Sequence, residues 1–164
     1  MMPYLNEMYG NSASRTHKFG WEANDAVKLA RERVSSLINA KPDEIIFTSG
    51  STEGINFLIK GIYDQYSEKG NHIITVKTEH KAVLSTCEYL ETKGFEITYL
   101  DIDENGLISL EQLRKTIKQN TILFVIMYAN NETGVIQSIK EIGALAREHN
   151  ITFFSDATQA VGKI

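Results

Sequence analysis

Short apolar segments alternate with helical patterns along most of the chain, and this alternation constrains the fold more than any other feature. The expected strands are residues 45–47, 72–76, 96–100, 122–127 and 151–154, and the expected helices are 22–39, 52–65, 81–93, 110–118 and 139–149. Residues 122–127 are continuously apolar, which is typical of a strand buried on both faces. Strands separated by helices of this length predict a mostly parallel, open α/β sheet with helices on both faces and right-handed crossovers.

The composition excludes several classes of protein. A length of 164 residues with 42% hydrophobic residues suffices for one core. The net charge of −4 and the lack of a Lys/Arg run argue against a nucleic-acid-binding surface. No segment approaches the roughly 20 apolar residues of a membrane span. Cys87 is the only cysteine, so no cysteine-rich metal site is expected, and its place in a helical pattern favours a buried, inert thiol.

Ligands of open parallel sheets bind outside the carboxyl ends of the strands, so the residues that follow each strand are the first candidates for a site. After residues 45–47 comes Gly50, followed by Ser51 and Thr52 at the start of a helix. The hydroxyl groups could cap that helix, and its free N–H groups could bind a phosphate. A well-capped turn without a ligand explains the same residues.

Three more candidates follow the later strands. His80 comes after residues 72–76 and could stack on a flat cofactor and transfer protons near neutral pH. Asn131 belongs to an Asn-Asn-Glu-Thr-Gly segment that is also typical of a turn. Asp156 follows an apolar strand and needs a cation or a hydrogen-bond donor, although a helix N-cap is an equally good interpretation.

Taken together, five sequence blocks resemble the cysteine desulfurase family, which is class V of the fold-type I pyridoxal 5′-phosphate (PLP) enzymes. The blocks are residues 10–17 (GNSASRTH), 47–53 (FTSGSTE), 78–84 (TEHKAVL), 130–134 (NNETG) and 156–163 (DATQAVGK). They occur in the family's order, and the Thr-Glu-His-Lys form is similar to the housekeeping iron–sulfur assembly branch.

The resemblance implies a role for each matching residue. Ser51 and Thr52 match the positions that hold the cofactor phosphate. His80 matches the histidine that stacks on the pyridine ring and assists proton transfer. Asn131 and Gln159 match contacts to the phenolic oxygen, and Asp156 matches the partner of the ring nitrogen, for which an ionised carboxylate is suited.

The resemblance also implies an activity and partners. It implies conversion of L-cysteine to L-alanine with a persulfide left on the enzyme, delivery of that sulfur to an iron–sulfur scaffold or another acceptor protein, and a homodimer. Contact with nucleic acid is expected only indirectly, through tRNA thiolation pathways. The expected location is the cytoplasm, or the mitochondrial matrix in a eukaryote, with no membrane association.

We expect residues 1–164 to form only part of the large, PLP-binding domain. In the family, an N-terminal segment precedes the matched region, the Schiff-base lysine lies in a Ser-Gly-His-Lys block just beyond it, and the persulfide cysteine and a small C-terminal domain follow later. Lys163 belongs to the Ala-Val-Gly-Lys block instead. A chain that lacks the anchoring lysine is expected to be inactive alone.

Two other interpretations remain open from the sequence. The first is another class V enzyme, such as a selenocysteine lyase or an aminotransferase, because the phosphate loop and Asp156 serve that chemistry equally well. The second is a non-catalytic α/β module that binds a partner protein.

Overall fold

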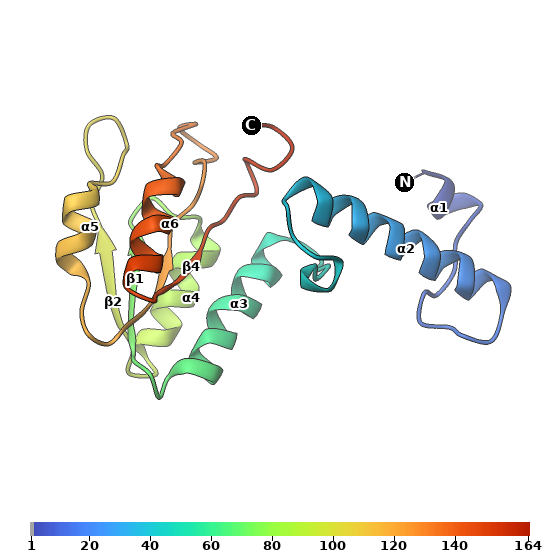
Figure 1. Ribbon diagram of the computed structural model, residues 1–164, viewed down its shortest axis with the longest axis horizontal. Helices are drawn as coiled ribbons and strands as arrows, with labels where there is room; N and C mark the ends of the chain where they lie inside the picture. Colours follow the sequence, from blue (N-terminus) through green and yellow to red (C-terminus); the bar gives the residue numbers. More distant parts are fainter. Residues whose placement is uncertain (1) are drawn as a thin grey trace. The chain divides into compact units, whose positions relative to one another are not determined.

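A computed structural model describes residues 2–164 and divides the chain into two compact units. The first unit ends at Phe47, and the second runs from Thr48 to Ile164. The ribbon in Figure 1 follows the chain through both units. Every candidate site residue named above lies in the second unit, so that unit alone carries the site.

The first unit is helical. It contains α1 (Met2–Asn6), α2 (Lys18–Leu37) and the short 3-10 helix η1 (Pro42–Glu44). The α2 helix begins four residues earlier than the sequence predicts because His17 caps it: the Nδ1 atom of His17 accepts a hydrogen bond of 3.2 Å from the Gly20 N–H. In residues 2–164, no helix is both long and apolar enough to cross a membrane.

The predicted strand at residues 45–47 is wrong. The backbone of Ile45 is extended, but residues 45–47 pair with no other strand in the described chain. The side chains of Ile46 and Phe47 are 65% and 50% exposed. An apolar, β-branched run favours extended backbone, but only a hydrogen-bonded neighbour makes it a strand.

The second unit is the predicted α/β sheet, with four strands in place of five. The strands are β1 (His72–Val76), β2 (Glu96–Leu100), β3 (Thr121–Val125) and β4 (Thr152–Phe154), and the helices are α3 (Ser51–Tyr66), α4 (Lys81–Glu91), α5 (Leu110–Thr116) and α6 (Ile139–Glu148). All strand pairs are parallel, and the order across the sheet is β2-β1-β3-β4. The prediction of a parallel sheet flanked by helices is therefore confirmed.

The strand order creates a switch point between β1 and β3. After β1 the chain moves outward to β2, whereas after β3 it moves in the opposite direction to β4. Connections that leave in opposite directions open a crevice at the carboxyl ends of the two central strands. This position is where a ligand of such a sheet is expected.

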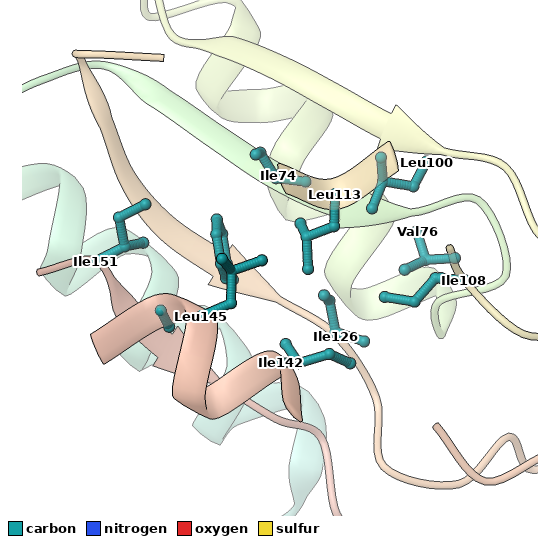
Figure 2. Close-up of a cluster of buried hydrophobic side chains, with 11 residues drawn as sticks. Ile74, Val76, Leu100, Ile108, Leu113, Ile126, Ile142, Leu145 and Ile151 are labelled. Carbon is teal, nitrogen blue, oxygen red and sulfur yellow. The ribbon is translucent and has the colours of Figure 1, made fainter. Parts of the chain in front are cut away.

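Helices cover both faces of the sheet because successive strand residues point to opposite sides. One core contains Ile74, Phe124 and Ile126 with the inner faces of α5 and α6, and Figure 2 shows how Leu113, Ile142 and Leu145 point into it. The neighbouring strand residues pack against α3 and α4 on the other face; the second core comprises Ile55, Ile59, Ile73, Val83, Cys87, Leu90, Phe95, Leu123 and Val125. The two layers of helices fix the strand ends that carry the site.

Candidate functional site

A cavity lies at the carboxyl ends of the central strands, and it brings together five of the six predicted site residues. Its volume is about 180 Å³, and it is lined by Ser51, His80, Met127, Ala129, Asn131, Asp156, Thr158 and Gln159. The predicted Thr52 lines an adjoining groove between α3 and α4, to which His80 also contributes. The candidate residues come from four segments of the chain, which the sheet edge brings to one place.

The N-terminus of α3 borders this cavity with free backbone donors. The N-cap residue is Gly50, and no side chain makes a capping hydrogen bond there. Ser51 and Thr52 are the first two helical residues, so the interpretation of their hydroxyl groups as caps is wrong. The first N–H groups of a helix have no intrahelical acceptor, and together with the helix dipole they favour an anion.

His80 stands at the N-terminus of α4, and its imidazole serves as the cap. Its Nδ1 atom accepts a hydrogen bond of 3.1 Å from the Ala82 N–H. Since Nδ1 is an acceptor, the hydrogen of the neutral ring lies on Nε2. The ring is thus fixed at one nitrogen and keeps an N–H donor at the other.

The two adjacent asparagines do different things. Asn130 supports the loop: its Nδ2 donates to the Thr78 carbonyl at 3.0 Å, and its Oδ1 accepts from the N–H groups of Glu132 and Thr133. The side chain of Asn131 is exposed and lines the cavity. The loop therefore presents the second asparagine, as the family pattern suggests, and uses the first to hold its shape.

Asp156 follows β4 and is half-buried. Its Oδ1 accepts hydrogen bonds from the Thr158 N–H at 3.0 Å and from the Thr158 hydroxyl at 2.6 Å, and turns rather than a helix follow. The alternative interpretation of Asp156 as a helix N-cap is therefore wrong. Both contacts fall on one carboxylate oxygen, so the other stays available to a cation or donor in the cavity.

Gln159 contributes an amide from the last turns of the chain. Its Oε1 accepts a hydrogen bond of 2.6 Å from the Lys163 Nζ, and its Nε2 can still donate to an oxygen in the cavity. Lys163 is thus occupied by Gln159 and does not line the cavity.

Glu79 is buried beside the site, although no pattern in the sequence singled it out. Its side chain is only 5% exposed, and its Oε1 accepts a hydrogen bond of 2.6 Å from the N–H of the cavity residue Met127. Burial, opposed by that hydrogen bond and reinforced by the charge of Asp156, raises the pKa of Glu79 to about 8. The signal that could have identified it is an acidic residue within the segment that joins an apolar strand to His80.

A protein-family model and named relatives match this chain. A family model described as aminotransferase class-V matches residues 1–164. Cysteine desulfurase IscS of Ehrlichia chaffeensis is 57% identical over 164 residues, which are all of this chain and 40% of that relative. IscS of Neisseria meningitidis serogroup C is also 57% identical, over all of this chain and 41% of the relative.

Solved structures give the same result in three dimensions. A structure titled NifS-like protein superposes with a TM-score of 0.94 at 39% sequence identity. The superposed region comprises 99% of this chain and 45% of the chain of that structure. A structure of SspA in complex with cysteine superposes with a TM-score of 0.90 at 41% sequence identity. Here the superposed region comprises 96% of this chain and 45% of the SspA chain. The chain spans about two fifths of the length of the curated relatives it matches. This chain belongs to the aminotransferase class-V family.

Proposed function

We propose that residues 1–164 form part of the PLP-binding domain of a cysteine desulfurase, which converts L-cysteine to L-alanine and carries the sulfur as a persulfide for iron–sulfur cluster assembly. The observation that carries the proposal is the grouping of His80, Asn131 and Asp156 around one cavity at the switch point of the sheet. The identity to IscS proteins and the complex of the structural relative SspA with cysteine support cysteine as the substrate.

The chemistry of the donor set fits PLP. The uncapped N-terminus of α3 suits a phosphate, and the Asp156 carboxylate suits a protonated ring nitrogen. The amides of Asn131 and Gln159 suit the phenolic oxygen, and the imidazole of His80 suits the face of the ring. When bound, PLP supplies an electron-accepting ring that stabilises negative charge at the substrate α-carbon.

The residues of this chain then have defined tasks. Ser51 and Thr52 hold the phosphate, and Asp156 keeps the ring nitrogen protonated. His80 donates or accepts a proton at Nε2, because Nδ1 is tied to the Ala82 N–H. In this proposal, the lysine that binds PLP covalently and the cysteine that carries the persulfide come from other parts of the protein. The reason is that Lys163 donates a hydrogen bond to Gln159 and Cys87 is buried.

The experiment is a substitution at Asp156 in the complete protein that carries this chain. Asp156→Asn removes the charge opposite the ring nitrogen, and we expect alanine and sulfide production from cysteine to fall about 100-fold. Asp64→Asn, the same change at an exposed position of α3, is the matched control. Equal activity of Asp156→Asn and the control would contradict the assignment.

The substrate is tested separately. The PLP-loaded protein is supplied with cysteine, selenocysteine and ordinary amino-group donors, and alanine and sulfide are measured. Alanine from selenocysteine alone would indicate a lyase for that substrate, and amino transfer would indicate an aminotransferase. Failure to bind PLP would favour a non-catalytic module.

Two further experiments test the proposed partners. Sedimentation of the complete protein tests the homodimer, and pull-down with a scaffold protein tests sulfur delivery.

A further inference from the structure

Glu79 and His80 are adjacent in sequence but face different surroundings. Strand β1 ends at Val76, and the turn that follows is closed by a hydrogen bond of 3.2 Å from the Glu79 N–H to the Val76 carbonyl. The turn directs the Glu79 side chain inward, where it is 5% exposed, and leaves His80 exposed at the cavity. A buried carboxyl group next to a predicted catalytic residue needs a physical reason.

The carboxyl group of Glu79 replaces a missing backbone partner at the switch point. Beyond the end of β3, Ile126 and Tyr128 donate their N–H groups to Phe154 and Asp156 on the β4 side. Backbone N–H groups alternate in direction along an extended strand, so the Met127 N–H points toward β1, which has already turned away. The Oε1 atom of Glu79 accepts this hydrogen bond at 2.6 Å.

In the part of the chain that the structure describes, neither a second hydrogen bond nor a cation stabilises a negative charge on Glu79. Oε2 of Glu79 is buried and has no hydrogen-bond partner, and no ion pair joins Glu79 to a cation within residues 2–164. The groups nearby that can carry charge are Asp156, which is acidic, the buried Cys87 thiol and the adjacent His80. Burial raises the pKa of Cys87 to about 12, so the thiol stays neutral.

A buried carboxylate with no cation is costly, and the neutral acid avoids that cost. Burial is the largest cause that raises the pKa of Glu79 to about 8, and repulsion from Asp156 adds to it. Glu79 therefore keeps its proton at neutral pH, and Asp156 is the only acidic residue among the eight that line the cavity.

We propose that Glu79 is a positioning residue of the cofactor site: a neutral carboxylic acid that holds the end of β3 through Met127 and leaves the negative charge at the site to Asp156. This inference rests on the proposed function, which it deepens. A protonated ring nitrogen at Asp156 would offset the repulsion that Glu79 experiences. Cofactor uptake is then linked to a downward shift of the pH at which Glu79 ionises.

The test compares three substitutions in the complete protein. Glu79→Gln is the neutral isostere, which keeps an oxygen for the Met127 N–H and cannot ionise. Glu79→Ala removes the acceptor and leaves that N–H unpaired. Glu88→Gln, the same carboxyl-to-amide change at an exposed position of α4, is the control. Two measurements are made on each: infrared difference spectra of the carboxyl group across pH, and the dissociation constant of PLP.

In the apoprotein, we expect the band of the protonated acid to disappear only as the pH passes about 8, and to be absent in Glu79→Gln. With PLP bound, the same band should disappear at a lower pH. Glu79→Gln should bind PLP within about threefold of the unsubstituted protein, and Glu79→Ala should bind about tenfold more weakly, the effect of one unpaired buried N–H.

Ionised Glu79 in the apoprotein at neutral pH would overturn the inference, as would an affinity loss in Glu79→Gln equal to that in Glu79→Ala. If the band of protonated Glu79 disappears at the expected pH in the apoprotein but at the same pH with PLP bound, the link between Glu79 and the cofactor is overturned. If the unsubstituted protein fails to bind PLP, the proposed function fails, whereas the apoprotein titration still decides the charge state of Glu79.

Discussion

The imidazole Nδ1 of His80 accepts a hydrogen bond from the Ala82 N–H, so one side chain both caps α4 and borders the cavity. This contact predicts that the two tasks can be separated. His80→Asn keeps a short polar acceptor at the N-cap, and His80→Ala removes it. We expect His80→Ala to cost about 1 kcal/mol of stability and His80→Asn much less.

On the proposed function, both His80 substitutions should lower alanine production from cysteine about 100-fold, because both remove the group proposed to transfer protons. Thermal unfolding and alanine production, measured on the complete protein, check the two parts. Activity that follows stability, with His80→Asn nearly as active as the unsubstituted protein, would mean that His80 is only a cap.

Cys87 should be chemically inert in the folded protein. Its side chain is fully buried in the core beneath α4, and burial raises the pKa of the thiol to about 12. Thiolate is the reactive form, so alkylating reagents should modify Cys87 only after denaturation. Mass spectrometry of protein treated before and after unfolding measures this difference.

On the proposed function, Cys87→Ala should leave alanine production from cysteine unchanged. Cys87→Ser should be the less stable of the two because it buries a hydroxyl group. A persulfide detected on Cys87 during turnover would contradict both its inertness and the placement of the sulfur carrier elsewhere.

The sequence could predict the elements whose stability comes from burial. Residues 122–127 are all apolar, as are three of the five residues 72–76; helices cover both faces of the sheet there, and that composition is visible in the chain itself. Residues 45–47 are also apolar but have no neighbouring strand within residues 2–164. Whether a strand from elsewhere in the chain pairs with them cannot be predicted from these three residues alone. The same limit explains Glu79, since only the turn after β1 determines that Glu79 points inward and His80 does not.

His72 predicts how stability depends on pH. Its ring bridges three strands: Nδ1 lies 2.7 Å from the Thr121 hydroxyl, and Nε2 lies 2.8 Å from the Thr98 hydroxyl. Burial, and then the positive charge of Lys118, lowers the pKa of His72 in the folded protein. The unfolded chain therefore binds a proton more readily, so the contribution of neutral His72 is complete above the unfolded pKa of about 6.5 and is lost as the pH falls below it.

Denaturant unfolding of the complete protein at a series of pH values should show this loss. Replacement by an uncharged residue, His72→Gln, should make the acidic side of the profile flatter, although it lowers stability at all pH values. His149→Gln, the same change at the exposed end of α6, is the control. An unchanged acid slope in His72→Gln would show that other groups cause the dependence.

The adjacent asparagines provide the sharpest separation of structure from function, because they differ in contacts and not in chemistry. Asn130 makes hydrogen bonds to Thr78, Glu132 and Thr133, whereas Asn131 is exposed and lines the cavity. Asn130→Ala should lower the free energy of unfolding by about 2 kcal/mol, since it removes these three hydrogen bonds at once, of which the one to the Thr78 carbonyl is partly buried. Asn131→Ala should leave stability nearly unchanged and weaken PLP binding about tenfold, the effect of one lost hydrogen bond to a charged oxygen.

Each asparagine variant serves as the control for the other, measured by denaturant unfolding of the apoprotein and by titration with PLP. Because Asn130 shapes the loop that presents Asn131, some loss of PLP affinity in Asn130→Ala is expected and does not count against the assignment. A loss of stability in Asn131→Ala as large as that in Asn130→Ala would count against it, because a side chain whose task is to contact the cofactor has no such effect on the empty protein.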